Sequence, residues 1–167
     1  MLKKIKNKNL LILLFAASAI ALIGAYISQY FFGYEPCILC LEQRKPFFAI
    51  IATSALTLTY FKSEKSKKNA LYLCTILLVI NFALAIYHSG VEKKIFRGPV
   101  TCSSETLNKI DNIEDLKIAL SETKAIRCDE PSFLFLNLSM ANWNALYCLL
   151  LVSYIGFIRY QRLSALL

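Results

Sequence analysis

The sequence predicts an all-α integral membrane protein, a four-helix bundle with two periplasmic loops. Of its 167 residues, 57% are apolar, and the mean hydropathy of +0.51 exceeds that of a typical water-soluble domain. Four long runs are apolar on every side rather than along one stripe, which disfavours a soluble helical bundle. The net charge of +8 lies mainly in short segments beside these runs. It therefore indicates membrane topology rather than nucleic-acid binding.

The first apolar run covers residues 10–32 and contains no charged residue. At about 1.5 Å per residue it reaches about 34 Å, which is enough to cross a bilayer. A cleaved signal peptide is the alternative, because Ala19-Ile20-Ala21 resembles a cleavage site. The run continues well beyond that point, so we expect it to remain as a membrane helix.

Three further runs complete the predicted bundle, which we treat as one membrane domain over residues 1–167. The second run, 46–61, is short and opens with Pro46, a residue that suits the first turn of a helix. The third and fourth runs cover residues 70–88 and 140–158, and Ser139 is the candidate N-cap of the fourth.

Basic residues mark the connections that we expect to face the cytoplasm. The N-terminal tail holds four lysines, segment 62–69 holds four lysines and one glutamate, and the C-terminal tail holds two arginines. Segment 89–138, in contrast, has seven basic and eight acidic residues. The positive-inside rule then places both termini in the cytoplasm and loops 33–45 and 89–138 on the outward side. If the membrane is the inner membrane of a Gram-negative bacterium, that side is the periplasm.

The cysteines divide according to this topology, although the topology was inferred from charge alone. Four of the six lie in the two outward loops, where disulfides persist: Cys37, Cys40, Cys102 and Cys128. The other two, Cys74 and Cys148, lie inside apolar runs, and we expect them to be buried side chains without a redox role.

Cys37-Ile38-Leu39-Cys40 forms a C-x-x-C motif just before the second run. In such a motif the thiol pKa can fall, and a helix N-terminus also favours a thiolate. Arg44 follows within about one helical turn, where it could stabilise the thiolate or a reduced electron acceptor. The alternative is an arginine that reaches the lipid headgroups.

His88 is the only histidine and ends the third run at the outward interface. At that level it could donate a proton to a quinone carbonyl, although an ordinary interfacial histidine fits the sequence equally well.

Two other uses of the four outward cysteines remain open. Zinc requires four nitrogen or sulfur ligands, but the spacing from Cys102 to Cys128 is unlike a second C-x-x-C, so we expect no metal. Purely structural disulfides are the stronger alternative, and four cysteines allow three pairings. Between Cys102 and Cys128, residues 112–120 predict a short amphipathic helix, either on the membrane surface or packed in the loop.

Several motifs together resemble the DsbB family of disulfide bond formation proteins. Residues 37–44 match that family's C-x-L-C-x-x-Q-R pattern, and the resemblance extends over nearly the whole chain. Supporting matches are Tyr87-His88, the pair Cys102 and Cys128, and Leu138-Ser139-Met140-Ala141 leading to Trp143-Asn144. The chain departs from the family at Asn137 and Asn142, where we expect glycines; asparagine tolerates glycine-like backbone angles better than most residues.

The resemblance implies a specific electron path. The Cys102–Cys128 disulfide would oxidise a periplasmic DsbA-like thioredoxin-fold protein, whose thiolate attacks Cys102. The released Cys128 would attack Cys37, leaving Cys40 as the thiolate that faces ubiquinone or menaquinone. Arg44 would hold the quinone, with His88 nearby.

Two alternatives to this enzyme remain. One is a membrane scaffold whose disulfides are structural, and the other is a thiol redox enzyme similar to vitamin K epoxide reductase. The second family usually carries its C-x-x-C late in the chain, whereas here the motif comes early.

Overall fold

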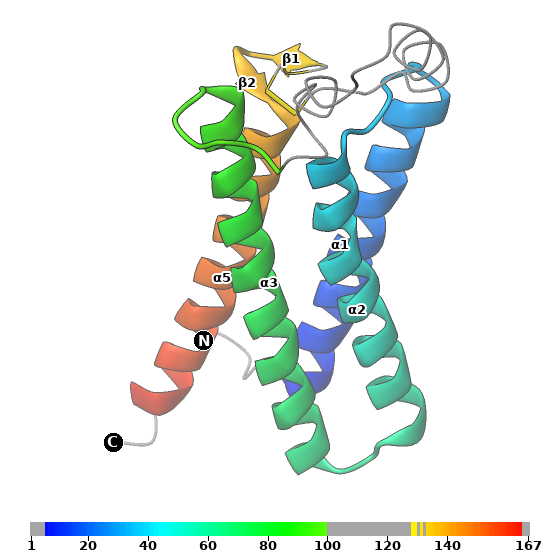
Figure 1. Cartoon of the computed structure of the whole chain (residues 1–167). Helices are drawn as coiled ribbons and strands as arrows, with labels where there is room; N and C mark the ends of the chain where they lie inside the picture. Colours follow the sequence, from blue (N-terminus) through cyan, green and yellow to red (C-terminus); the bar gives the residue numbers. More distant parts are fainter. Residues whose placement is uncertain (1–5, 100–127, 130, 132, 165–167) are drawn as a thin grey trace, which may run out of the picture.

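The structure is a computed structural model that describes residues 6–99, 128–129, 131 and 133–164. Its long helices lie side by side (Figure 1): α1 (Asn7–Tyr30), α2 (Ile38–Tyr60), α3 (Glu64–Glu92) and α5 (Met140–Ser164). The predicted all-α bundle is therefore confirmed. Cys102 and the helix predicted at 112–120 lie outside the described residues.

The core of the bundle is built mainly from leucine and isoleucine. Helix α3 packs against each of the other three helices. Buried apolar side chains from all four helices form one cluster, which includes Leu14, Ile50, Leu78 and Ile155. Cys74 and Cys148 belong to this cluster and are fully buried, as the sequence predicted.

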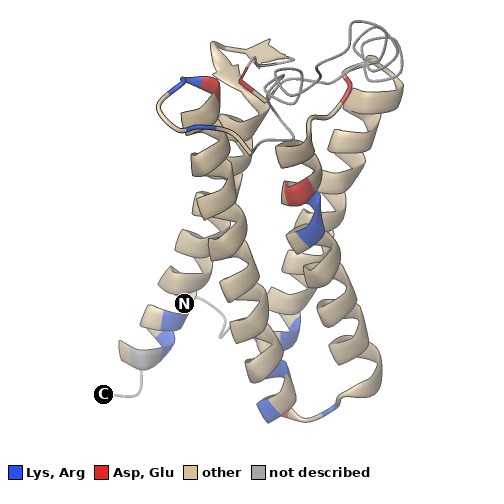
Figure 2. Ribbon diagram, viewed as in Figure 1, with Lys and Arg blue, Asp and Glu red and all other residues tan. Residues whose placement is uncertain are grey.

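Three helices are long and apolar enough to cross a membrane: α1, α3 and α5, the last counted to Arg162. Helix α2 has a similar length, but its first two turns carry Glu42, Arg44 and Lys45. These charges lower its average hydropathy, and they lie at the end of the bundle far from the chain termini (Figure 2).

Helix α2 begins eight residues earlier than expected, so the prediction of a loop over the whole of 33–45 is wrong. Pro46 lies inside the helix rather than in its first turn. The proline removes one backbone hydrogen bond, a cost that tertiary packing can outweigh. The N-terminus is fixed instead by Cys37, whose Sγ accepts a hydrogen bond from the backbone N–H of Cys40.

A small β-hairpin, absent from the predictions, leads into α5. Strands β1 (Leu134–Phe135) and β2 (Leu138–Ser139) pair antiparallel around a two-residue turn. Leu136 and Asn137 have φ angles of 53° and 60°, as a type I′ turn requires. Asn137 therefore has the glycine-like backbone expected of it.

The start of α5 follows the prediction from sequence. Ser139 precedes the helix, and its Oγ accepts a hydrogen bond from the backbone N–H of Asn142 at 3.3 Å, so it is the N-cap. Asn142, the second departure from the family pattern, accepts a hydrogen bond from Ser89 of α3 at 2.7 Å. Its amide thus joins two helices, which a glycine could not do.

Candidate functional site

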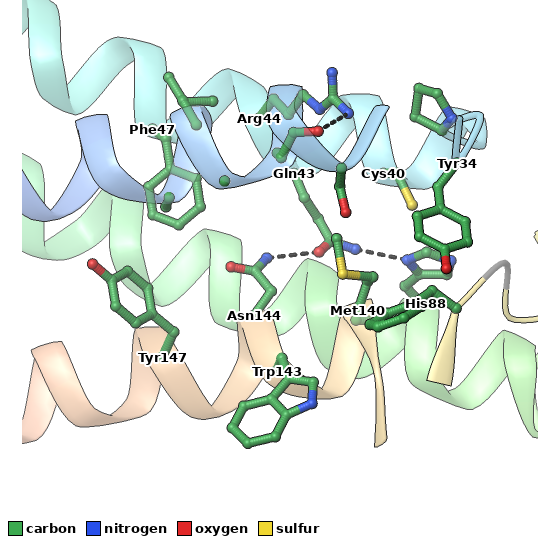
Figure 3. Close-up of a pocket in the computed structure, with 18 of the residues that line it drawn as sticks. Tyr34, Cys40, Gln43, Arg44, Phe47, His88, Met140, Trp143, Asn144 and Tyr147 are labelled. Carbon is green, nitrogen blue, oxygen red and sulfur yellow. Dashed lines mark hydrogen bonds between the residues drawn. The ribbon is translucent and has the colours of Figure 1, made fainter. Parts of the chain in front are cut away.

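A cavity of about 420 Å³ opens at the end of the bundle far from the termini. It is bordered by the second half of α1, the first turns of α2 and α5, and the last turns of α3 (Figure 3). Most of its lining is apolar, with Phe47, Met140 and Trp143 among the lining residues. Its polar groups are few, as in most small-molecule binding pockets.

Cys37 and Cys40 both line this cavity as free thiols. Their sulfur atoms lie 3.2 Å apart, and the Cys40 backbone N–H donates to Cys37 Sγ at 3.3 Å. Cys37 is 4% exposed and Cys40 is partly exposed. The C-x-x-C motif therefore forms a compact dithiol in which Cys37 is buried as a residue and Cys40 is partly exposed.

A third cysteine joins this dithiol from the second loop. Cys128 is disulfide-bonded and buried, and it packs in one cluster with Cys37, Leu39 and Val91. Cys40 packs against the same cluster. The structure thus brings together three of the four predicted site cysteines. Because the Cys128 sulfur is in a disulfide, the alternative of a four-cysteine zinc site does not describe this arrangement.

Cys37 is the sulfur of the pair that ionises more readily. A hydrogen bond from the Cys40 thiol lowers the pKa of Cys37, and the contact with His88 lowers it further. Burial acts in the opposite direction and is outweighed. The reduced site therefore holds a thiolate at Cys37, the chemical form that attacks disulfides.

His88 lies against this sulfur rather than at an open interface. It is 2% exposed, and its Nε2 is 3.5 Å from Cys37 Sγ. The same nitrogen is 3.7 Å from Glu92 Oε1, while Nδ1 is 2.8 Å from Gln43 Nε2. Helix α3 continues four residues past the end predicted from sequence, which is why the imidazole has neighbours on both sides.

Three residues of this site were not among the predicted site residues: Gln43, Glu92 and Asn144. Gln43 is part of the C-x-L-C-x-x-Q-R pattern, which was the available signal. Glu92 follows His88 by four positions, so the helical spacing i, i+4 would have indicated a contact had the third helix been extended. Asn144 was part of the family match at Trp143-Asn144, but its contact with Gln43 depends on how α5 is rotated and could not be read from the sequence.

Arg44 also lines the cavity but is held against α1. Its Nη1 donates to Gln29 Oε1 at 2.7 Å and its Nη2 to the Ala25 carbonyl at 3.5 Å. The guanidinium carbon lies 4.9 Å from the centre of the Tyr26 ring. Among the described residues these partners carry no formal charge, so the arginine keeps its full positive charge beside the cavity.

Comparisons with known proteins agree with this geometry. The chain matches the family described as disulfide bond formation protein DsbB over residues 7–158. An uncharacterized protein of Rickettsia prowazekii (strain Madrid E) is 32% identical over 158 residues, covering 94% of this chain and 90% of that protein. No solved structure matches the chain significantly.

The family match covers the dithiol, Cys128, the first three long helices and α5 as far as residue 158. Three of those helices are apolar enough to span a membrane. The chain therefore belongs to the DsbB family, whose members are membrane thiol oxidoreductases that act in disulfide bond formation.

Proposed function

We propose that this protein oxidises a periplasmic DsbA-like thioredoxin-fold protein and passes the electrons to ubiquinone or menaquinone in the cavity. One observation carries the proposal: the disulfide-bonded Cys128 packs in the same buried cluster as the free thiol of Cys37, beside the cavity. A disulfide in contact with a dithiol can exchange with it, because exchange requires only that a thiolate reach a disulfide sulfur.

The proposed relay has three sulfur steps. In the oxidised enzyme, with disulfides Cys102–Cys128 and Cys37–Cys40, a thiolate of the partner attacks Cys102 and forms a mixed disulfide. Cys128 leaves as a thiolate and attacks Cys37, so that Cys40 leaves as a thiolate at the cavity. The partner's second thiol then displaces Cys102, and the partner departs with its own disulfide.

The cycle balances in electrons and protons. The partner's two thiols lose two electrons and two protons as its disulfide forms. A quinone in the cavity supplies the chemistry that sulfur lacks, since it accepts both electrons and both protons. Re-formation of the Cys37–Cys40 and Cys102–Cys128 bonds returns the enzyme to its starting state.

The residues around the cavity fit a quinone. Its volume of about 420 Å³ and mostly apolar lining suit a ring with an apolar tail. The positive charge of Arg44 lies beside the cavity, where it would stabilise negative charge on the reduced ring. The high reduction potential of a quinone would make electron transfer from the thiols downhill. For a two-electron couple, about 30 mV of potential difference corresponds to about 1.4 kcal/mol.

We also propose that both termini face the cytoplasm and that the cavity faces the periplasm. Lys and Arg dominate the end of the bundle with the termini and the α2–α3 connection, and most described Asp and Glu lie at the other end (Figure 2). The positive-inside rule supports this orientation, which gives the dithiol access to an oxidising compartment.

An assay with purified components tests the function. We expect the protein, mixed with a reduced DsbA-like protein and a soluble quinone analogue, to lower the quinone absorbance catalytically. Cys40→Ser should abolish turnover, whereas Cys74→Ser, at a core cysteine that does not line the cavity, should retain it. A wild-type protein without turnover, or a Cys40→Ser variant with full turnover, would instead favour a scaffold with structural disulfides.

A further inference from the structure

A chain of hydrogen bonds runs from the core of the bundle to His88. Cys148 Sγ donates to Asn144 Oδ1 at 3.6 Å, and Asn144 Nδ2 donates to Gln43 Oε1 at 2.6 Å. Gln43 Nε2 then lies 2.8 Å from His88 Nδ1. Figure 3 shows the last two bonds as dashed lines between α5, α2 and α3.

The chemistry of these groups gives the chain a direction. An amide nitrogen can only donate, so with Gln43 Nε2 facing the ring His88 Nδ1 accepts the hydrogen bond and carries no proton. A neutral imidazole has one N–H, which is then on Nε2. Reversing the Gln43 amide alone would place two donors face to face at Asn144 Nδ2, which also donates to Asn81 Oδ1 at 3.4 Å. Reversing Gln43, Asn144 and Asn81 together would also satisfy the amides, because Asn81 Nδ2 is buried without a partner among the described residues, so the contacts of Nε2 decide the direction.

The protonated nitrogen points at the reactive sulfur. His88 Nε2 lies 3.5 Å from Cys37 Sγ and 3.7 Å from Glu92 Oε1. The other carboxylate oxygen of Glu92 accepts a hydrogen bond from Ser139, the N-cap of α5. A thiolate and a carboxylate both need a donor at this position, and a lone pair on Nε2 would repel them.

We propose that Gln43 and Asn144 are positioning residues that fix His88 in the Nε2–H tautomer, so that its imidazole donates a hydrogen bond to the Cys37 thiolate. The tautomer is inferred from what faces the two ring nitrogens in the reduced dithiol, whereas its role in turnover rests on the proposed function. In this role His88 transfers no proton to the quinone, which revises the role expected for it from the sequence.

The same argument bears on metal binding. The ligand atoms of Cys37, Cys40 and His88 lie within 4.8 Å of one another, close enough for one metal ion. A metal at Nε2 needs a lone pair there, however, and Nδ1 would then have to carry the proton and lose its donor from Gln43. The amide chain therefore opposes a metal and favours the thiolate.

The titratable groups around Cys37 come from two helices and the second loop. Cys40 lies on its own helix, and His88 and Glu92 come from α3. Cys128 packs against it but does not titrate, because it is disulfide-bonded. The variants below leave Cys40 and Glu92 unchanged. A change in the ionisation of Cys37 in those variants would therefore report a change in the His88 tautomer.

Nitrogen NMR on the full-length protein in detergent or nanodiscs tests the tautomer directly. His88 is the only histidine, so ¹⁵N-histidine labelling gives two ring signals that need no assignment between residues. At neutral pH we expect a protonated Nε2 and an unprotonated Nδ1. An Nδ1–H tautomer or a doubly protonated ring in the wild type would overturn the proposal.

Variants at Gln43 supply the second arm. In Gln43→Glu the carboxylate can only accept, so Nδ1 should gain a proton; Gln161→Glu, at the far end of α5, is the matched control and should leave the ring signals unchanged. In Gln43→Met, which adds no buried charge, the ring should lose its single tautomer. We expect the thiolate absorbance of Cys37 to titrate about one pH unit higher in Gln43→Met, a tenfold weaker ionisation.

The readouts separate the two proposals. If the ring is Nε2–H but the wild type reduces no quinone, the function fails and the tautomer stands. If quinone is reduced but the ring signals of wild type and Gln43→Glu are the same, the positioning role of Gln43 is wrong.

Discussion

Cys37 and Cys40 have different surroundings although only two residues separate them. Cys37 caps α2, is 4% exposed and contacts His88, whereas Cys40 is partly exposed; both line the cavity. The difference gives the two sulfurs different chemistry in the reduced state: one is held as a thiolate and the other keeps its proton beside the cavity. Two neighbouring thiols can therefore have separate tasks in one relay.

The ionisation of Cys37 leads to a prediction about pH. Its pKa is lowered by folding, chiefly by the hydrogen bond from Cys40. The thiolate stabilises the folded protein. This stabilisation is fully present above the pKa of an unfolded thiol, about 8.5, and is lost as the pH falls to the lowered pKa of Cys37 in the folded protein. In the reduced protein, we expect a small alkylating reagent to modify Cys37 rapidly even at about pH 6, where ordinary thiols react slowly. Peptide mapping by mass spectrometry measures this rate.

Cys40→Ala is the informative comparison for that experiment, because it removes the largest cause of the lowered pKa. Alkylation of Cys37 should then slow at about pH 6 and recover near pH 9. A rate that is unaffected by the substitution would mean that Cys40 does not stabilise the thiolate.

Arg44 should affect the quinone more than the protein partner. Arg44→Ala removes the positive charge beside the cavity, so we expect the Michaelis constant for quinone to rise about tenfold, equivalent to roughly 1.4 kcal/mol. Steady-state kinetics with varied quinone measure this constant. Arg159→Ala, whose guanidinium packs on Tyr72 on the cytoplasmic side of the proposed topology, is the control and should leave it unchanged. An unaltered constant in Arg44→Ala would remove this arginine from the quinone site.

At the scale of elements, the start of α5 forms one wall of the site, and the hairpin leads into that wall. Ser139 ends β2, caps α5 and donates a hydrogen bond to Glu92 of α3. Aromatic rings pack beside this wall. The ring centroids of Phe133 and Tyr34 are 4.9 Å apart, and those of Phe135 and Trp143 are 6.0 Å apart. A short hairpin thus connects the second loop to the helix that carries Asn144.

The cap at Ser139 should be measurable in stability. Ser139→Ala removes the N-cap acceptor and should lower the free energy of unfolding by about 0.5–2 kcal/mol. Unfolding in mixed micelles by far-ultraviolet circular dichroism follows this change. Ser153→Ala, at an exposed position within α5, should cost much less, and equal losses in both variants would argue against the cap.

The hairpin turn gives a second prediction at this scale. Asn137 has a φ of 60°, a left-handed conformation that is strained for most residues with a Cβ. Asparagine tolerates it better because its short polar side chain can hydrogen-bond locally. Asn137→Ala should lower stability by roughly 1 kcal/mol, whereas Asn137→Gly should be neutral or stabilising. Thermal unfolding of the two variants in the same detergent compares them, and a more stable alanine variant would contradict the strained turn.

On the scale of the whole molecule, the basic chain termini and the redox site lie at opposite ends. The termini and the α2–α3 connection lie at one end of the bundle (Figures 1 and 2). The dithiol, Cys128 and the cavity lie where α2 begins and α3 ends, which is the other end. Helices of about 30 Å or more separate them, close to the thickness of a bilayer's hydrocarbon core. A dithiol at such a position can meet both a soluble partner and a lipid-soluble quinone.

Cysteine labelling in cells tests this orientation. In a variant lacking the native cysteines, Lys94→Cys should react with a membrane-impermeant maleimide in spheroplasts, whereas Lys65→Cys should react only after permeabilisation. Both positions are exposed, and they lie beyond α3 and within its first turn, respectively. The reverse pattern would place the dithiol in the cytoplasm and exclude the proposed partner.

The sequence by itself determined the helices, the grouping of the cysteines and the N-cap at Ser139, because apolar length, charge balance and capping are properties of short segments. It misjudged the start of α2, where a proline was read as a boundary although the Cys37 cap and tertiary packing carry the helix through it. It also left His88 at an interface. Only the tertiary structure decided that His88 meets Cys37, Gln43 and Glu92, and that Arg44 rests on α1. Those contacts depend on how each helix is rotated against its neighbours, and uniformly apolar helices carry no stripe in their sequence that would fix this rotation.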